Sequence, residues 1–301
     1  MIRAEQVTKT FDSFPAVSGL SCEIPKGCIY GLIGANGAGK STFLRLVTGV
    51  YQADQGEITL DGEPVYENPK AKRRMAFVPD ELYFLGSSSM NRMATLYGAI
   101  YPHFDKARYT ELTELFGLNP KANVGTFSKG MRRQAATILA LSCNPEYIFF
   151  DETFDGLDPV VRNLVKNLIA EYVLERGTTA IITSHSLREL EDTCDQLALL
   201  YKGGIVFESE VQNLKTSLFK VQVAFREDYD QTLFQGLELI NYTKRGSVAS
   251  FIVRGNREET HAFLATKSPI LLDILPLSLE EVFIHEMQAL GYAFNHVSGE
   301  E

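Results

Sequence analysis

The chain lacks several features that define large classes of proteins. No N-terminal signal peptide and no apolar run of membrane-spanning length are evident in its 301 residues. If the protein acts at a membrane, we expect another chain to supply the spanning helices. An excess of basic residues is missing too, since 29 Lys and Arg stand against 38 Asp and Glu, for a formal net charge of −9. This balance argues against nucleic acid as a partner.

Cysteine is scarce and is not arranged for metal binding. The four cysteines, at positions 22, 28, 143 and 194, form no CxxC pair. We therefore expect reduced, mostly structural thiols in a cytosolic protein, without a zinc site. The length is sufficient for one large domain or two ordinary ones, with ample core.

A glycine-rich segment is the strongest motif present. Residues 34–42 read G-A-N-G-A-G-K-S-T, after an apolar run and before a helix-like stretch. This is the context of a P-loop, whose backbone N–H groups and helix N-terminus hold phosphates. Lys40 can reach the β- and γ-phosphates, and the Ser41 hydroxyl can bind Mg²⁺. The expected nucleotide-binding residues are Gly34, Asn36, Gly37, Ala38, Gly39, Lys40, Ser41 and Thr42.

An apolar strand at residues 147–150 ends in two carboxylates, Asp151 and Glu152. The carboxyl end of such a strand opens onto the ligand crevice of an α/β sheet. Asp151 can hold Mg²⁺ there, directly or through water, and Glu152 can orient or deprotonate the attacking water. Strand-end solvation or helix capping would explain the pair as well if it stood alone. Its combination with the P-loop favours a nucleotide site.

The order of elements predicts an α/β fold with a second, smaller domain. Strands alternate with long helices over residues 1–215, as in a mainly parallel sheet, and Asp61-Gly62 marks a hairpin. Residues 216–301 read β-α-β-β-α-β, the order of a ferredoxin-like α+β unit. A final helix is expected from Ser278, with Glu281 completing a capping box, to about Gly291. The other main helices are expected at residues 90–101, 106–116, 129–142, 159–176, 187–194, 229–235 and 258–266.

Three further segments resemble motifs of the ATP-binding cassette (ABC) ATPases. Residues 127–131, F-S-K-G-M, resemble the signature motif; residues 155–159, D-G-L-D-P, the D-loop; and residues 184–186, S-H-S, the switch histidine. Phe11 stands upstream of the P-loop, where these proteins place an aromatic that stacks on adenine. Each segment alone would be weak, but together they make the chain similar to this family over residues 1–215.

The resemblance implies a fold and a reaction. The fold would be an ABC cassette, with a P-loop RecA-like α/β core, an antiparallel β subdomain and a helical subdomain over about residues 86–142. The ligands would be ATP and Mg²⁺, and the reaction ATP hydrolysis. Lys40, Glu152 and His185 would be the catalytic residues, with His185 bonded to the γ-phosphate.

The resemblance also implies an assembly. In ABC ATPases the signature meets the nucleotide held by the P-loop of the opposite subunit. Ser128, Gly130 and the D-loop residue Asp158 would therefore face ATP on a second ATPase subunit, either another copy or a related chain. A helix N-terminus at Ser128 would offer free N–H groups to the γ-phosphate.

The chain departs from the family pattern at two places. Asp80 follows the strand at residues 75–79, where the family usually has the glutamine of its Q-loop. A carboxylate can still accept from Mg²⁺-bound water, so Asp80 is expected to serve the metal, with Glu81 as the alternative. Lys129 and Met131 replace the usual glycine and glutamine of the signature, and Lys129 either reaches phosphate or is solvated.

The resemblance favours an exporter ATPase at the cytoplasmic face of a membrane, working with a separate transmembrane permease. Residues 277–283, L-S-L-E-E-V-F, resemble the ending of bacterial drug- and peptide-export ATPases. Aromatic and methionine residues at 83–101 suit a groove for a permease helix, or ordinary core packing. The alternatives are an importer ATPase with a C-terminal regulatory domain and a soluble ABC ATPase acting on nucleic acid or ribosomes.

Overall fold

The computed structural model describes residues 1–289, without the side chains of residues 215, 217 and 289. The chain divides into two compact units between Glu208 and Ser209. The sequence suggested a boundary after residue 215. The division falls earlier because helix α8 (Val211–Ser217) packs against helix α10 (Leu279–Ala289) inside the second unit.

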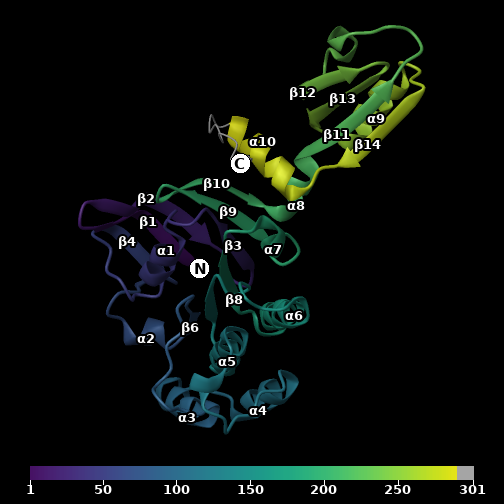
Figure 1. Cartoon of the computed structure of the whole chain (residues 1–301). Coiled ribbons are helices and arrows are strands. Elements are labelled where there is room, and N and C mark those ends of the chain that lie inside the picture. The colour runs from purple at the N-terminus through teal and green to yellow at the C-terminus, as the bar shows by residue number, and fades with distance from the viewer. Residues whose placement is uncertain (290–301) are drawn as a thin grey trace, which may run out of the picture. The chain divides into compact units, whose positions relative to one another are not determined.

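Two sheets build the first unit (Figure 1). An antiparallel sheet has the order β2-β1-β4-β5, and a six-stranded sheet has the order β10-β9-β3-β8-β7-β6. Strands β6, β7, β8, β3 and β9 pair in parallel, so the predicted parallel sheet is confirmed. The strands are β1 (Ile2–Phe11), β2 (Phe14–Ile24), β3 (Ile29–Ile33), β4 (Gln55–Leu60), β5 (Glu63–Pro64), β6 (Met75–Val78), β7 (Tyr147–Asp151), β8 (Thr179–Ser184), β9 (Gln196–Tyr201) and β10 (Gly204–Glu210).

The core of this unit lies around helix α1 (Lys40–Val47), which contacts β7 as well as β1, β2 and β4. Its apolar residues Phe43, Leu44 and Val47 are fully buried. Strands β3, β7 and β8 are buried at every residue, as expected of parallel strands covered on both faces. Their register brings the carboxyl ends of all three strands together at one edge of the sheet.

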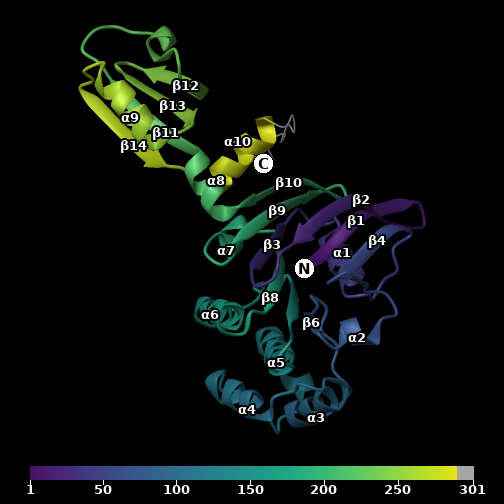
Figure 2. The same cartoon turned by 180° about the vertical axis from the view of Figure 1, so that it is seen from behind.

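Helices α3, α4 and α5 lie together in both views of the chain (Figures 1 and 2). Helix α5 begins after Ser128 and helix α6 after Asp158, because each of these side chains accepts hydrogen bonds from the first turn. Both helices have the predicted bounds. The helices of this unit are α1, α2 (Pro69–Lys72), α3 (Met90–Ile100), α4 (Lys106–Leu115), α5 (Lys129–Ser142), α6 (Pro159–Arg176) and α7 (Leu187–Glu191), with a 3₁₀ turn η1 (Val124–Thr126).

The prediction of a helix over residues 187–194 is wrong at its end, because α7 stops at Glu191. The backbone N–H groups of Thr193 and Cys194 both turn back to the carbonyl of Leu190. Asp195 then accepts a hydrogen bond from the backbone of Ile29 at 2.8 Å, which fixes the entry into β9 beside β3.

The second unit contains an antiparallel sheet of order β12-β13-β11-β14 around an aromatic core. Phe234 lies at the centre of this core, with its ring centroid 4.7 Å from that of Phe251. Its elements are α8, β11 (Leu218–Ala224), η2 (Gln231–Phe234), β12 (Glu238–Arg245), β13 (Val248–Arg254), α9 (Arg257–Ala265), β14 (Leu271–Pro276) and α10.

One prediction for this unit is wrong and another is confirmed. The prediction of a helix over residues 229–235 is wrong, because Asp230 folds back onto the backbone N–H of Thr232 and leaves only the 3₁₀ turn η2. Ser278 and Glu281 do form the expected capping box, with the backbone N–H of Ser278 donating to the Glu281 carboxylate at 2.9 Å. The expected end of α10 near Gly291 lies outside the described residues.

Candidate active site

The loop between β3 and α1 approaches neighbouring backbone so closely that two of its positions require glycine. A Cβ at Gly34 would lie 2.6 Å from the Leu200 carbonyl oxygen, and one at Gly39 would lie 2.3 Å from that of Ala16. Gly39 also has φ +111, a conformation that other residues avoid. These contacts fix the loop and place the start of α1 at the carboxyl edge of the sheet.

Lys40 is a buried cation inside this loop, with 5% of its side chain exposed. Its ammonium donates to the carbonyl oxygen of Gly34 at 2.6 Å and lies 3.1 Å from a carboxylate oxygen of Glu152. The loop residues Asn36 and Gly37 are exposed, whereas Ala38 is buried and Thr42 is half-buried. The lysine expected to contact phosphate is therefore held by the backbone of its own loop and by Glu152.

Asp151 is a fully buried carboxyl at the end of β7. One of its oxygens, Oδ1, accepts from the Ser41 hydroxyl at 3.0 Å and from the Thr183 hydroxyl at 2.8 Å. The other oxygen, Oδ2, is buried and has no hydrogen-bond partner among the described residues. Burial raises the pKa of this carboxyl, and the charges of Asp80 and Glu152 raise it further. An unpartnered carboxylate oxygen beside a hydroxyl fits a hard divalent cation such as Mg²⁺.

Glu152 is aimed by its backbone, which has φ +48, in the left-handed region that most residues avoid. Its backbone N–H donates to the Thr183 hydroxyl at 3.1 Å. Its carboxylate contacts Lys40 through one oxygen and His185 Nδ1, at 2.9 Å, through the other. The sequence-predicted residues Lys40, Ser41, Asp151, Glu152 and His185 thus form one continuous cluster.

Phe11 is an exposed aromatic at the end of β1, with its ring edge-on to Tyr51 at a centroid distance of 5.3 Å. It pairs with Phe14 of β2, two residues before Ala16, whose carbonyl lies against Gly39. The aromatic side chain therefore lies on the hairpin that borders the glycine loop.

The signature-like segment forms a second cluster with the loop before α6. The Lys129 ammonium lies 2.9 Å from the Asp155 carboxylate, and a Cβ at Gly130 would lie 3.2 Å from the carbonyl oxygen of Gly156. Within residues 1–289, no hydrogen bond joins Ser128 or Gly130 to the glycine loop. Ser128 and Asp158 serve as helix caps here, so each has a structural role beside its predicted one.

Comparison with known proteins identifies the family. A model of the ABC transporter family matches residues 17–155. The ABC transporter ATP-binding protein YtrB of Bacillus subtilis (strain 168) is 31% identical over 285 residues, which are 94% of this chain and 97% of that protein. The chain belongs to the ABC transporter family. As an ABC ATPase it binds and hydrolyses ATP, and the subunits of this kind dimerise and work with a membrane permease.

Two further proteins are similar to this ABC ATPase, one in sequence and one in structure. The Nod factor export ATP-binding protein I of Burkholderia pseudomallei (strain 1710b) is 31% identical over 290 residues, or 93% of this chain and 94% of that protein. A dimeric post-hydrolysis structure of an ATP-binding cassette bound to ADP and Pi has a TM-score of 0.64 and 20% identity, and it covers 70% of this chain and 99% of that one. The latter likeness shows the ABC cassette fold.

Two residues at the site of this ABC ATPase were missed from the sequence, Thr183 and Arg133. Thr183 is an ordinary strand residue, and only the pairing of β7 with β8 places it beside Asp151. Arg133 is fully buried on α5 and donates to Asp80 at 2.7 Å. Its spacing of three, seven and eight residues from the apolar Ala136, Ala140 and Leu141 of the same helix is a signal that could have found it. Lys129, expected either to reach phosphate or to be solvated, has 68% of its side chain exposed and makes a surface ion pair with Asp155.

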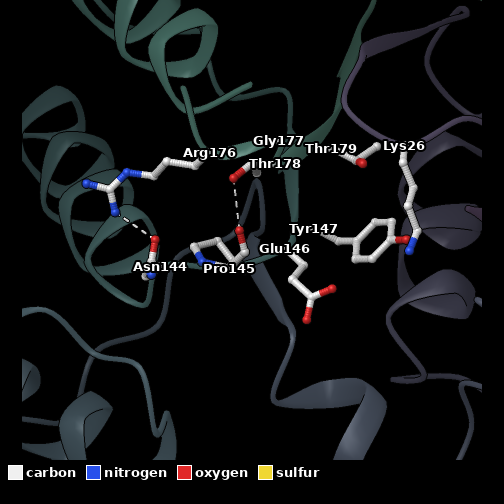
Figure 3. Close-up of a pocket in the computed structure, with 9 residues that line it drawn as sticks. All are labelled: Lys26, Asn144, Pro145, Glu146, Tyr147, Arg176, Gly177, Thr178 and Thr179. Atoms are coloured by element: carbon white, nitrogen blue, oxygen red, sulfur yellow. Dashed lines mark hydrogen bonds between the residues drawn. The ribbon is translucent and has the colours of Figure 1, made fainter. Parts of the chain in front are cut away.

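A pocket of about 390 Å³ lies at the opposite edge of the sheet (Figure 3). Tyr147 and Thr179, which line it, are the first residues of β7 and β8, whereas the site described above follows their last residues. In Figure 3 the guanidinium of Arg176 turns to Asn144, with which it forms a hydrogen bond of 2.7 Å. This pocket is therefore separate from the ATP site.

None of the helices in the described part of the ABC ATPase is long and apolar enough to cross a membrane.

Proposed function

We propose that this chain is the ATPase subunit of a bacterial exporter for drugs, peptides or other amphipathic compounds, acting on a separate permease at the cytoplasmic face of the membrane. The support is the match over nearly the full length of both chains to an ATP-binding protein named for Nod factor export. The exporter-like ending at residues 277–283 adds to it. Leu279 and Val282 of this ending are fully buried, so the motif builds α10.

The proposed hydrolytic roles follow from the cluster at the carboxyl edge of the sheet. Lys40 would exchange its contacts with Gly34 and Glu152 for the β- and γ-phosphates. Ser41 and Asp151 would hold Mg²⁺, which would supply charge neutralisation between the phosphates when bound. Glu152 would orient the attacking water, and His185, bonded to it at 2.9 Å, would hold that carboxylate in place beside the γ-phosphate.

We further propose that two ATPase subunits close head to tail around two nucleotides. The N-terminus of α5 carries Ser128 and Gly130, which have no hydrogen bond to the glycine loop of their own chain in the described structure. Free N–H groups at such a helix end suit the γ-phosphate of a nucleotide held by the second subunit. Asp158 and Phe11 would complete the site, at the D-loop and at adenine respectively.

The permease would dock on the helical segment. A groove of about 520 Å³ lies between α3 and α4 and is lined by Ala94, Gly98 and Phe104 among others. Tyr83, in the segment before α3, has 83% of its surface exposed. The apolar residues of this groove, and the exposed aromatic side chain of Tyr83 in the same segment of the chain, suit an amphipathic helix from the permease.

The closure mechanism is tested with Glu152→Gln, which keeps the shape of the side chain and removes its charge. With ATP and Mg²⁺ we expect a stable dimer by light scattering, because binding persists while hydrolysis slows. Wild-type protein with ATP in EDTA is the control and should remain monomeric. A variant that stays monomeric at high protein concentration with Mg²⁺ and ATP would contradict the closure mechanism.

The exporter role is tested on the complex that co-purifies from detergent-solubilised membranes. Reconstituted into vesicles, the complex should show ATPase activity that rises with amphipathic drugs or peptides added on the ATPase side. Stimulation that requires a soluble binding protein on the opposite side would instead indicate an importer. Recovery with ribosomes and no membrane protein would indicate a soluble ABC ATPase.

A further inference from the structure

The ion pair between Asp80 and Arg133 is strongly asymmetric. The guanidinium of Arg133 donates through Nη2 to Asp80 Oδ1 at 2.7 Å, with 48% of the Asp80 side chain exposed but only 1% of Arg133. Removing a buried cation from water is costly unless an anion compensates it. Arg133 therefore depends on Asp80 far more than Asp80 depends on Arg133.

The same guanidinium reaches a second strand end. Arg133 Nη1 lies 3.4 Å from the backbone carbonyl oxygen of Asp151, at the end of β7. Asp80 comes two residues after β6, which pairs in parallel with β7. Because the guanidinium is planar and rigid, its two arms hold these strand ends in a fixed relation. Arg133 itself belongs to α5, the helix that begins at the signature-like segment.

The charges of the site explain why a cation is needed at this position. Asp80, Asp151 and Glu152 bring three carboxylates to the carboxyl edge of β6 and β7. Lys40 faces Glu152, and Arg133 faces Asp80, so two of the three acids, Glu152 and Asp80, each have a buried cation as partner. A glutamine, which the family usually has in place of Asp80, would carry no charge and would leave Arg133 without a counter-ion.

We propose that Arg133 is a positioning residue, which holds Asp80 at the metal-binding edge of the sheet and couples that carboxylate to the position of α5. This inference rests on the proposed function, since it assigns Asp80 to the Mg²⁺–ATP site. It makes Asp80 and Arg133 one functional unit. When α5 moves, the carboxylate of Asp80 moves with it.

The pairing itself is tested without nucleotide, by urea unfolding of the full chain. Asp80→Asn should lower the unfolding midpoint clearly, because it leaves a buried cation unpaired. The matched control is Asp155→Asn, whose carboxylate is 49% exposed and pairs with the exposed Lys129, and which should change the midpoint little. Adding Arg133→Met to Asp80→Asn should raise the midpoint again, since an apolar side chain needs no counter-ion. An additive loss in the double variant would overturn the pairing.

The positioning role is tested by ATP binding with a fluorescent ATP analogue, in EDTA and over a Mg²⁺ titration. Asp80→Asn and Arg133→Met should each shift the half-saturating Mg²⁺ concentration several-fold, and the double variant no further than one of them. Affinity in EDTA should stay at the wild-type value. Arg133→Lys keeps the positive charge but not the two N–H arms of the guanidinium, so it should give an intermediate shift of the half-saturating Mg²⁺ concentration.

The outcomes separate the two proposals. Wild-type protein that shows no Mg²⁺-dependent ATP binding would overturn the proposed function, and the role of Asp80 with it. Normal wild-type binding, together with shifts that multiply in the double variant, would overturn the Arg133 proposal alone. A purely structural Arg133 would lower the urea midpoint and leave the Mg²⁺ titration unmoved, which would also overturn it.

Discussion

At the scale of single residues, Asp151 shows a conflict between stability and ligand binding. Its carboxyl is fully buried, one oxygen lacks a partner among the described residues, and its pKa is raised by burial. A carboxyl whose pKa is raised in the folded state adds stability below its unfolded-state pKa. That contribution is lost as the pH rises through the folded-state value. In its ionised form the buried carboxyl therefore opposes folding.

Asp151→Asn should accordingly stabilise the protein in the absence of ATP and metal. We expect a gain of roughly 1–2 kcal/mol in the free energy of unfolding at neutral pH, from removing the buried charge. The measurement is urea unfolding in EDTA, compared with the same pair of proteins at acidic pH, where the gain should shrink. A variant less stable than wild type at both pH values would contradict this reading.

Lys40→Ala should remove most of the affinity for ATP. The loss of a charge-assisted contact to phosphate is worth about 2 kcal/mol or more, or roughly a 30-fold weaker binding. Calorimetry measures it directly. Lys72→Ala is the control, because the Lys72 ammonium also donates to a backbone carbonyl, that of Gly49 at 2.8 Å, but far from the site. Equal binding by Lys40→Ala and wild type would refute the phosphate role.

At the scale of elements, local signals decide what the sequence reveals. Helix α6 has the predicted bounds because Asp158 caps it, Pro159 fits its first turn and Gly177 ends it in a left-handed conformation. The failure at η2 has a local cause too, since Asp230 captures the backbone N–H of Thr232. An apolar pattern alone does not show such competition.

Parts of the site were less predictable because they are made by contacts between distant segments. The P-loop and the strand ending at Asp151 each carry a contiguous motif, so both could be found from the sequence. The ion pair between Asp80 and Arg133 joins residues 53 positions apart, and neither lies in a motif that requires the other. Thr183 reaches Asp151 only because β7 and β8 are neighbours.

The caps of α5 and α3 offer a matched comparison. Ser128 accepts from the backbone N–H of Met131 at 3.2 Å, and Ser89 accepts from that of Arg92 at 3.3 Å. Either serine changed to alanine should cost about 1 kcal/mol of stability. Only Ser128→Ala should also weaken the ATP-dependent dimer of the Glu152→Gln protein, measured by light scattering. Equal dimer formation by both variants would assign Ser128 a capping role alone.

At the scale of the whole molecule, the chain combines an ATPase unit with a unit that has its own core. The last strand of the first unit carries Glu208, which accepts from the hydroxyl of fully buried Tyr30 at 2.8 Å. Residues 219–264 supply the separate aromatic core of the second unit. We therefore expect the first unit to require β10 and not the residues after it.

A chain ending after Glu210 should fold and bind ATP with the affinity of the full-length protein. A chain ending after Tyr201, which removes β10 and the partner of Tyr30, is the comparison and should be insoluble or unfolded. Circular dichroism and calorimetry with ATP distinguish the two. Loss of ATP binding by the chain that ends after Glu210 would instead mean that nucleotide binding needs the second unit.

The contact of Lys40 with Glu152, at 3.1 Å, has a consequence for the order of events. The carboxylate of Glu152 already neutralises the ammonium of Lys40. The γ-phosphate of ATP would therefore have to displace this carboxylate in order to contact the lysine. Glu152→Gln removes this competitor together with the hydrolytic group. The variant should therefore bind even a non-hydrolysable ATP analogue more tightly than wild type does. The glutamate would then have two effects, promoting hydrolysis and weakening the initial binding of nucleotide.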